Sequence, residues 1–187
     1  TVLKLEASLP NTPVVHVNHD DAVREPTNQL VYQKGAWVLH MLRAQVGTET
    51  FWRGIRDYYR QYVNTTASTD DFRQVMERAS GQDLTWFFRQ WLNRAGVPAV
   101  SGTWRYDAAA REVVITVRQT QAADPYRLQL GVGVIASESA LPNVRQMAVD
   151  GRETTIRVPA ASEPAAVVLD PAVTTLADVG TFTKVRP

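Results

Sequence analysis

The sequence contains no cysteine, which excludes disulfide bonds and every zinc site that uses thiolate ligands. It also has no run of about eighteen apolar residues, so it predicts no transmembrane helix. The opening segment, TVLKLEASLP, lacks the basic and then apolar pattern of a secretory signal peptide. None of these absences identifies a compartment, and the localisation stays unknown at this level.

An excess of charge of one sign is also missing. Twenty Lys and Arg residues stand against nineteen Asp and Glu residues, which leaves a formal net charge of +1, and no basic block interrupts the sequence. Because nucleic-acid-binding proteins concentrate basic residues on one face, we expect no nucleic-acid partner. The 187 residues, 44% of them hydrophobic, are enough for one large or two small folded domains.

The most distinctive stretch is VYQKGAWVLHMLRAQVG, residues 31–47, in which a polar cluster precedes an apolar helix. The helix is predicted over residues 33–46. Its apolar positions cover too much of the circumference for a surface helix, so we expect burial on most sides. On this interpretation His40 is a core histidine rather than a metal ligand. A site residue at the start of such a helix would have a rigid support.

The polar cluster consists of Tyr32, Lys34 and Gly35. We expect Gly35 to let the helix approach a neighbour closely and Lys34 to pair with a carboxylate. Tyr32 is the candidate functional residue of the cluster. From the residues alone, however, a tyrosine packed at a helix start with its hydroxyl bonded locally is the simpler interpretation.

The other helices follow from start and stop signals. Residues 1–30 are punctuated by Pro and Asn and are predicted to be irregular, with one short helix near LKLEASL. After Gly47 three more helices are expected, beginning near Glu49, Ser68 and Asp83. Short connections between them predict a bundle of short helices over residues 1–97.

The hydrophobic period changes from about 3.6 to 2 after Pro98, which marks a domain boundary. Residues 98–187 are predicted to form an antiparallel β-sandwich, whereas the tail from Val173 has no strong pattern. The fold class is therefore α+β with two domains. The expected strands are residues 102–106, 113–118, 126–135, 145–149, 153–158 and 165–169.

An ordered series of motifs resembles the M1 family of zinc aminopeptidases, the gluzincins that include aminopeptidase N and the leukotriene A4 hydrolases. The resemblance implies the end of a thermolysin-like catalytic domain followed by an immunoglobulin-like β-domain. In that family the tyrosine of the first motif donates a hydrogen bond to the oxyanion that forms at the scissile carbonyl, a role that falls on Tyr32. The motifs, in chain order, are Y-x-K-G-A-x-V-L-x-M-L, F-W-x-G-I-x-x-Y-Y, T-D-D-F, S-G-x-D-L, F-F-x-Q-W-L and G-V-P.

The resemblance also implies parts that this sequence does not contain. The family holds zinc through H-E-x-x-H and a further Glu, yet none of the three His residues here is followed by Glu. We therefore expect zinc ligands upstream of Thr1, in the missing N-terminal part of the same enzyme, and no metal or cofactor site in this chain. The chain alone is expected to be inactive toward peptide substrates and to self-associate through exposed apolar surface.

Two alternatives remain open. The string HVNHDD, residues 16–21, offers imidazole and carboxylate ligands, although no helix brings its two imidazoles to one face, and a solvated loop is the simpler interpretation. The second alternative is a non-enzymatic protein- or carbohydrate-binding module. Its binding face would use the aromatic residues Trp104, Tyr106 and Tyr126, which are more commonly core or edge residues in a sandwich.

Overall fold

The computed structural model describes residues 2–9, 11–15 and 25–186, without the side chains of residues 25–28. The chain divides into two compact units, Thr1–Gly96 and Val97–Pro187, and each is considered by itself. Within the described residues, no helix combines the length and the hydrophobicity needed to cross a bilayer.

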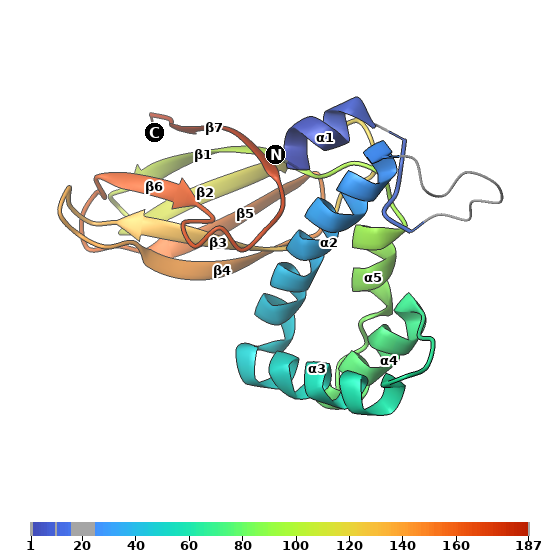
Figure 1. The fold of residues 1–187 in the computed structure, drawn as a ribbon. Coiled ribbons are helices and arrows are strands. Elements are labelled where there is room, and N and C mark those ends of the chain that lie inside the picture. The colour runs from blue at the N-terminus through green and yellow to red at the C-terminus, as the bar shows by residue number, and fades with distance from the viewer. Residues whose placement is uncertain (1, 10, 16–24, 187) are drawn as a thin grey trace. The chain divides into compact units, whose positions relative to one another are not determined.

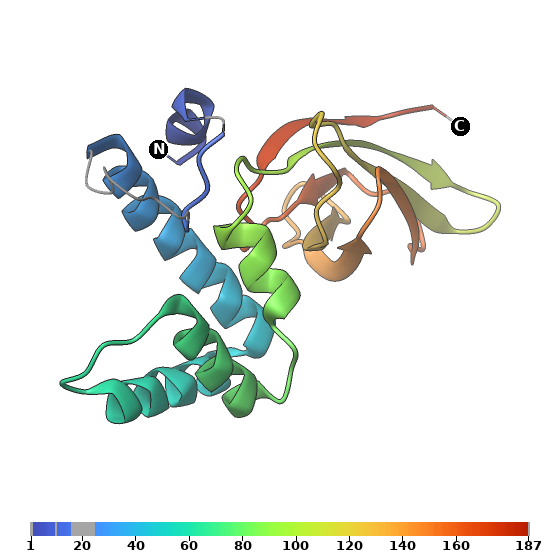
Figure 2. The same ribbon diagram turned by 90° about the vertical axis from the view of Figure 1, so that its right-hand side faces the viewer.

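The first unit is helical. The longest helix, α2, runs the length of the unit; α3 crosses its C-terminal end, α4 packs on α3, and α5 returns alongside α2 (Figures 1 and 2). Gly47 separates α2 from α3 with φ of 87°, a conformation that side chains with a Cβ rarely adopt. The helices in the described part are α1 (Val2–Ser8), α2 (Glu25–Val46), α3 (Thr48–Tyr62), α4 (Thr69–Ser80) and α5 (Thr85–Leu92).

The prediction of an irregular segment through residue 30 was wrong at its end, because α2 already begins at Glu25. Pro26 was interpreted as an interruption, but it lies in the first helical turn. There a missing N–H costs nothing, since the first N–H groups of a helix have no partner within it. The short helix expected near LKLEASL is confirmed as α1.

The expected burial of α2 on most sides is not found in this chain, whose described residues cover one face of the helix. One face is in the core, with Leu30, Val38 and Leu42 almost inaccessible, whereas Val31 and Leu39 are 43% and 42% exposed. His40 is exposed as well, and its ring meets Trp37 edge-on at 5.5 Å between centroids. The helix therefore has one apolar face in the core and a second apolar face at the surface. The surface face resembles a contact face more than a solvated one. The other large exposed apolar side chains are Leu3, Val15, Tyr32, Trp52, Tyr59, Val63, Leu141, Val144, Val173, Val179 and Val185.

Helix α4 begins where the sequence predicts, at a complete capping box. The Ser68 hydroxyl accepts from the Asp71 N–H at 3.2 Å, and the Asp71 carboxylate accepts from the Ser68 N–H at 2.8 Å. Together with the Ser68 and Tyr62 hydroxyls, the Ser68 N–H lowers the pKa of Asp71 below its ordinary value of 3.8. At the other end of α4, Gly81 adopts the left-handed conformation.

The lowered pKa of Asp71 predicts a pH-dependent contribution to stability. Because the folded carboxylate binds its proton less readily than the unfolded one, the contribution is present above pH 3.8 and is lost as the pH falls below it. Asp71→Ala is therefore expected to destabilise the protein near neutral pH and to have a smaller effect at about pH 3. Urea unfolding at the two pH values measures this difference. An equal destabilisation at both would show that the carboxylate charge plays no part.

The second unit contains two sheets. One has the strand order β5-β2-β1-β7 and the other β4-β3-β6, and every pairing is antiparallel except that between β1 and β7. Alternate side chains of β1 are buried, as a half-buried strand requires. The strands are β1 (Ala99–Asp107), β2 (Glu112–Gln119), β3 (Leu128–Ile135), β4 (Asn143–Val149), β5 (Glu153–Pro159), β6 (Ala166–Leu169) and β7 (Asp178–Lys184).

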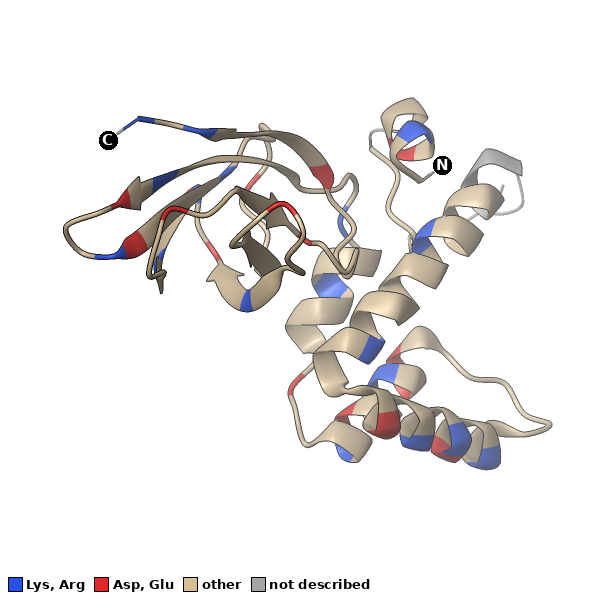
Figure 3. Cartoon of the chain, turned by 90° about the vertical axis from the view of Figure 1, so that its left-hand side faces the viewer, with Lys and Arg blue, Asp and Glu red and all other residues tan. Residues whose placement is uncertain are grey.

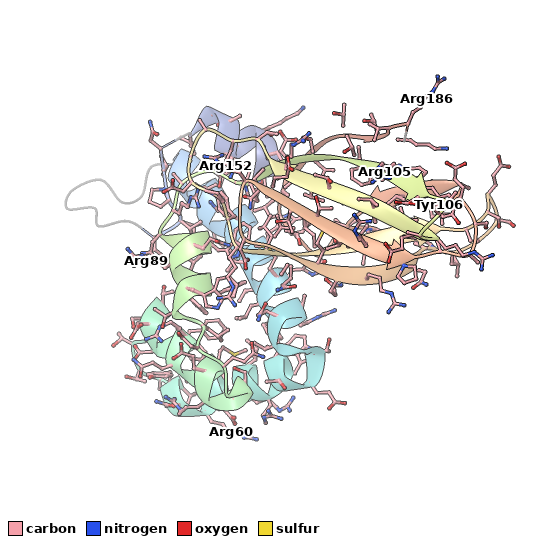
Figure 4. All side chains as sticks on the ribbon, turned by 180° about the vertical axis from the view of Figure 1, so that it is seen from behind. Arg60, Arg89, Arg105, Tyr106, Arg152 and Arg186 are labelled. Atoms are coloured by element: carbon pink, nitrogen blue, oxygen red, sulfur yellow. The ribbon has the colours of Figure 1, made fainter. Side chains whose placement is uncertain are left out.

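All six expected strands are present, and the tail adds a seventh. None of the residues of strand β7 is buried, and the strand is held by parallel pairing with β1, which the local sequence pattern does not reveal. The loop before β3 is held by Arg152 (Figure 4), whose guanidinium donates to the carbonyls of Gln121, Ala122 and Ala123. The amide of the buried Gln119 donates to the Tyr126 carbonyl and accepts from the Tyr126 N–H, both at 2.7 Å.

The aromatic residues considered for a binding face do not form one. Trp104 and Tyr126 are 5% and 1% exposed and belong to the core. Tyr106 (Figure 4) is half-buried, and its hydroxyl donates to the Ala160 carbonyl at 3.2 Å. The proposed carbohydrate- or protein-binding surface of this kind therefore has no support in the structure.

Gly102 lies at a close approach between strands β1 and β2. A Cβ at this position would collide with the backbone carbonyl of Thr116 and lie 2.7 Å from the Phe182 ring. Because a backbone atom cannot move aside as a side chain can, Gly102→Ala is expected to cost about 1–3 kcal/mol of unfolding free energy. Chemical denaturation measures this loss of unfolding free energy. The matched control is Gly180→Ala in the adjacent strand, where the nearest atom to a new Cβ is 3.5 Å away. Equal costs at the two positions would contradict the steric argument.

Candidate functional site

Tyr32 lies in the N-terminal half of α2 and projects from its uncovered face. Its side chain is 73% exposed, which is among the highest exposures of the large apolar and aromatic residues. Among the described residues its hydroxyl takes part in no hydrogen bond. A tyrosine with a locally bonded hydroxyl, the simpler of the two interpretations of the sequence, is therefore not what the structure shows. The phenol is available to a group outside this chain.

An apolar groove of about 600 Å³ runs beside Tyr32 between α2, α4 and α5. Charge is unevenly distributed around the groove. Helices α3 and α4 carry both acidic and basic residues, whereas most of α2 is uncharged (Figure 3). An uncharged, partly exposed helix face beside a groove suits contact with another apolar surface. The groove is lined by Val14, Val15, Val31, Tyr32, Gly35, Ala36, Val38, Leu39, Leu42, Tyr58, Ala67, Ser68, Thr69, Phe72, Phe88 and Leu92.

Lys34 is completely buried two positions after Tyr32. Its ammonium lies 2.7 Å from Glu6 Oε1 of α1, and both side chains are shielded from solvent. This contact is an ion pair without the alignment of a hydrogen bond. The ammonium also donates to the carbonyls of Gly96, at 2.9 Å, and Arg94, at 3.4 Å. The predicted pairing of Lys34 with a carboxylate is thus confirmed.

The same carboxylate completes a closed cluster around one residue, Gly96. Glu6 Oε2 accepts from the N–H of Gly96 at 3.1 Å, while Lys34 binds the carbonyl of the same residue. Gly96 has φ of 79°, which favours glycine at this position. The cluster thereby joins α1, α2 and the segment that follows α5. In this cluster Lys34, which belongs to the first family motif, contacts Gly96, which belongs to the last one.

The expectation that Gly35 allows a close approach was wrong. A Cβ built on Gly35 would meet no described atom within 4 Å, so this glycine borders open space beside the groove. The close approach occurs at Gly54 of α3, where a Cβ would collide with the buried Met76 of α4. Both glycines lie in family motifs, and only the three-dimensional packing distinguishes their roles.

A metal site is not formed by the described residues. Among them no group of three or more His, Cys, Asp or Glu side chains could hold a metal ion. The string HVNHDD lies outside the described residues, so that alternative stays a prediction. Zinc therefore does not fit the residues that the structure describes.

A second hollow, of about 470 Å³, lies at the start of α4, but its charges are mutually compensated. Arg73 pairs with Asp70 at 2.7 Å and with Glu77 at 2.6 Å. Hydrogen bonds from Gln74 and Arg73 lower the pKa of Asp70. Arg89, at the edge of the hollow, points outward from α5 (Figure 4). The acidic side chains beside this hollow are therefore already paired with Arg73.

The comparisons with known proteins agree on one family. The "Peptidase family M1 domain" matches residues 1–91. Aminopeptidase N of Escherichia coli is 34% identical over 117 residues, which is 61% of this chain and 13% of the relative. Aminopeptidase N of Lactococcus lactis is 36% identical over 90 residues, 46% of this chain and 10% of the relative. The chain thus spans about an eighth of the length of such relatives or less.

The fold agrees with a solved structure as well. Legionella pneumophila aminopeptidase A in complex with aspartic acid superposes with a TM-score of 0.70 over 81% of this chain and 18% of that one. The sequence identity is 16%, so this match shows the fold alone. The matched family domain ends close to the boundary of the helical unit, at Gly96. Residues 1–91, just under half of the chain, therefore match the family M1 peptidase domain, and the chain is similar to the aminopeptidases named above.

Proposed function

We propose that this chain is the part of a zinc-dependent metallo-aminopeptidase that supplies the oxyanion donor, Tyr32. The enzyme removes N-terminal residues from peptides. The observation that carries the proposal is the exposed hydroxyl of Tyr32, which bonds to none of the described residues and stands on a helix anchored from its opposite face. The names of the relatives, all aminopeptidases, support the reaction class.

The chemistry assigned to Tyr32 is hydrogen-bond donation. When a peptide carbonyl is attacked, negative charge develops on its oxygen, and a donor already in place stabilises that charge more than it stabilises the substrate. A phenol donates one proton and brings no positive charge of its own. Zinc, which polarises carbonyls and acidifies water, is assigned to another part of the enzyme. The chain alone is accordingly inactive.

The uncovered apolar face of α2 fits the same proposal. Val31 and Leu39 flank Tyr32 along this face, and contact with the zinc-bearing part of the enzyme would bury them. The proposal further assigns residues 98–187 to the immunoglobulin-like β-domain of the family. Separated from its enzyme, the chain is expected to self-associate through the face around Tyr32.

The experiment that tests the proposal is Tyr32→Phe in the whole zinc-loaded enzyme. Loss of kcat with little change in KM supports the assigned role, because the substitution removes only the donor. A near-normal kcat removes Tyr32 from the mechanism. Robust hydrolysis of aminoacyl amides by the purified chain alone would contradict the assignment of zinc to another part.

A further inference from the structure

We propose that Lys34 is a positioning residue for Tyr32. Its ion pair with Glu6, closed over the Gly96 peptide, holds α2 at the rotation that aims the Tyr32 hydroxyl. The inference rests on the proposed function of Tyr32. It assigns to Lys34 no contact with substrate or metal.

The geometry of the helix links the two residues. At 3.6 residues per turn, positions two apart lie about 200° apart around the axis. Tyr32 and Lys34 therefore occupy nearly opposite faces, which agrees with their exposures of 73% and 0%. If α2 rotates so that the Lys34 ammonium leaves its partners, the Tyr32 phenol on the opposite face moves through the same angle.

The cluster restrains that rotation in a way that the apolar core does not. Apolar contacts are non-directional, so by themselves they specify no particular partner atoms for the helix. The Lys34 ammonium instead has three partners: one carboxylate oxygen and two carbonyls, at 2.7, 2.9 and 3.4 Å. All three belong to other segments of the same unit. The carboxylate is itself held by the Gly96 N–H, so neither partner of the ion pair can swing freely.

Space filling alone does not explain why a lysine is buried at this position. The removal of two charges from water opposes folding, and apolar residues of similar volume are often equally stabilising. What the ion pair adds is a defined geometry. The proposed chemistry needs such a defined geometry at Tyr32, which lies two residues away on the face that the core leaves uncovered.

The experiment is a double-substitution cycle in the whole zinc-loaded enzyme. Lys34→Met combined with Glu6→Gln removes the ion pair, leaves no lone buried charge and keeps an oxygen for the Gly96 N–H. The combined variant is expected to lower kcat about 10- to 100-fold, since a misplacement of about 1 Å costs up to that much. KM should stay within about twofold. In the Tyr32→Phe background, the same pair of substitutions should lower kcat by less than about twofold further.

A second readout does not depend on activity. Amide hydrogen exchange of residues 30–36 is expected to become faster in the combined variant, while residues 39–46 keep their protection. The matched control is Lys184→Met. Lys184 also pairs with a carboxylate, Glu163 at 2.8 Å, but it is half-exposed and lies in the other unit. It should leave kcat and the exchange of residues 30–36 unchanged.

The outcomes separate this inference from the proposed function. If Tyr32→Phe leaves kcat near normal, the proposed function itself fails. If Tyr32→Phe lowers kcat but the combined variant does not, or lowers it equally in both backgrounds, the positioning role is overturned. If the combined variant does not fold, the same cycle is carried out with Lys34→Arg in its place, and its result decides whether Lys34 positions Tyr32. Lys34→Arg keeps the charge but presents a planar fork of donors that does not match the three partners of the ammonium.

Discussion

Tyr32→Phe in the whole zinc-loaded enzyme is expected to lower kcat about 10²- to 10³-fold, with little change in KM. The reason is that one donor to a developing oxyanion typically contributes about 2.7–4 kcal/mol to transition-state stabilisation. Ground-state binding does not need this bond, so the loss appears in kcat. Steady-state kinetics on an aminoacyl amide measures both constants.

Tyr59→Phe is the matched control for this substitution. Tyr59 is 69% exposed, is likewise helical and lies in the same unit, but it does not line the groove beside Tyr32. It should leave kcat unchanged. A comparable loss from both substitutions would point to a general effect of losing a surface hydroxyl. A rise in KM with kcat preserved in the Tyr32 variant would place the hydroxyl in substrate binding and not in transition-state stabilisation.

Lys34→Met alone is expected to reduce the free energy of unfolding by about 3–5 kcal/mol. The substitution leaves the Glu6 carboxylate buried without its cation, and a lone buried charge is far more costly than a buried pair. It also removes the donors to the Gly96 and Arg94 carbonyls. Chemical denaturation followed by far-ultraviolet circular dichroism measures the loss.

The combined variant, Lys34→Met with Glu6→Gln, should regain a large part of that stability. Replacing a buried ion pair as a unit is often neutral, whereas breaking one is not. The surface counterpart is Arg60, which pairs with Asp57 at 3.1 Å while largely exposed (Figure 4). Arg60→Met should cost no more than about 1 kcal/mol. If the single and combined Lys34 variants are equally destabilised, the cost lies in lost packing and not in the unpaired charge.

The elements that were predicted correctly depend on neighbours in the sequence. The capping box at Ser68 places both partners within one turn, so four consecutive residues suffice to predict where α4 begins. Strand β2 is likewise recognised within eight residues, although its burial does not alternate strictly, since Val113, Val114 and Ile115 are all buried. Tyr32 was identified through its family motif, since nothing in its own neighbourhood distinguishes an exposed tyrosine from a packed one.

The errors concern which face of an element is covered. His40 was placed in the core because Leu39 and Met41 flank it, but adjacent positions of a helix point about 100° apart. Met41 is buried and Leu39 is exposed. Strand β7 was missed because its parallel pairing with β1 joins residues far apart in the chain.

By itself, the sequence determined the resemblance to M1 aminopeptidases, the order of the helices and of every strand except β7, and the candidate donor that the resemblance assigns. These are properties of motifs and of hydrophobic period, which are local. Only the tertiary structure decided that the Tyr32 hydroxyl bonds to none of the described residues, that Gly54 and not Gly35 is the point of close approach, and that Lys34 meets Glu6 and Gly96. The partners of Lys34 lie 28 and 62 residues away, and contacts at such separations are set by the packing of the whole unit.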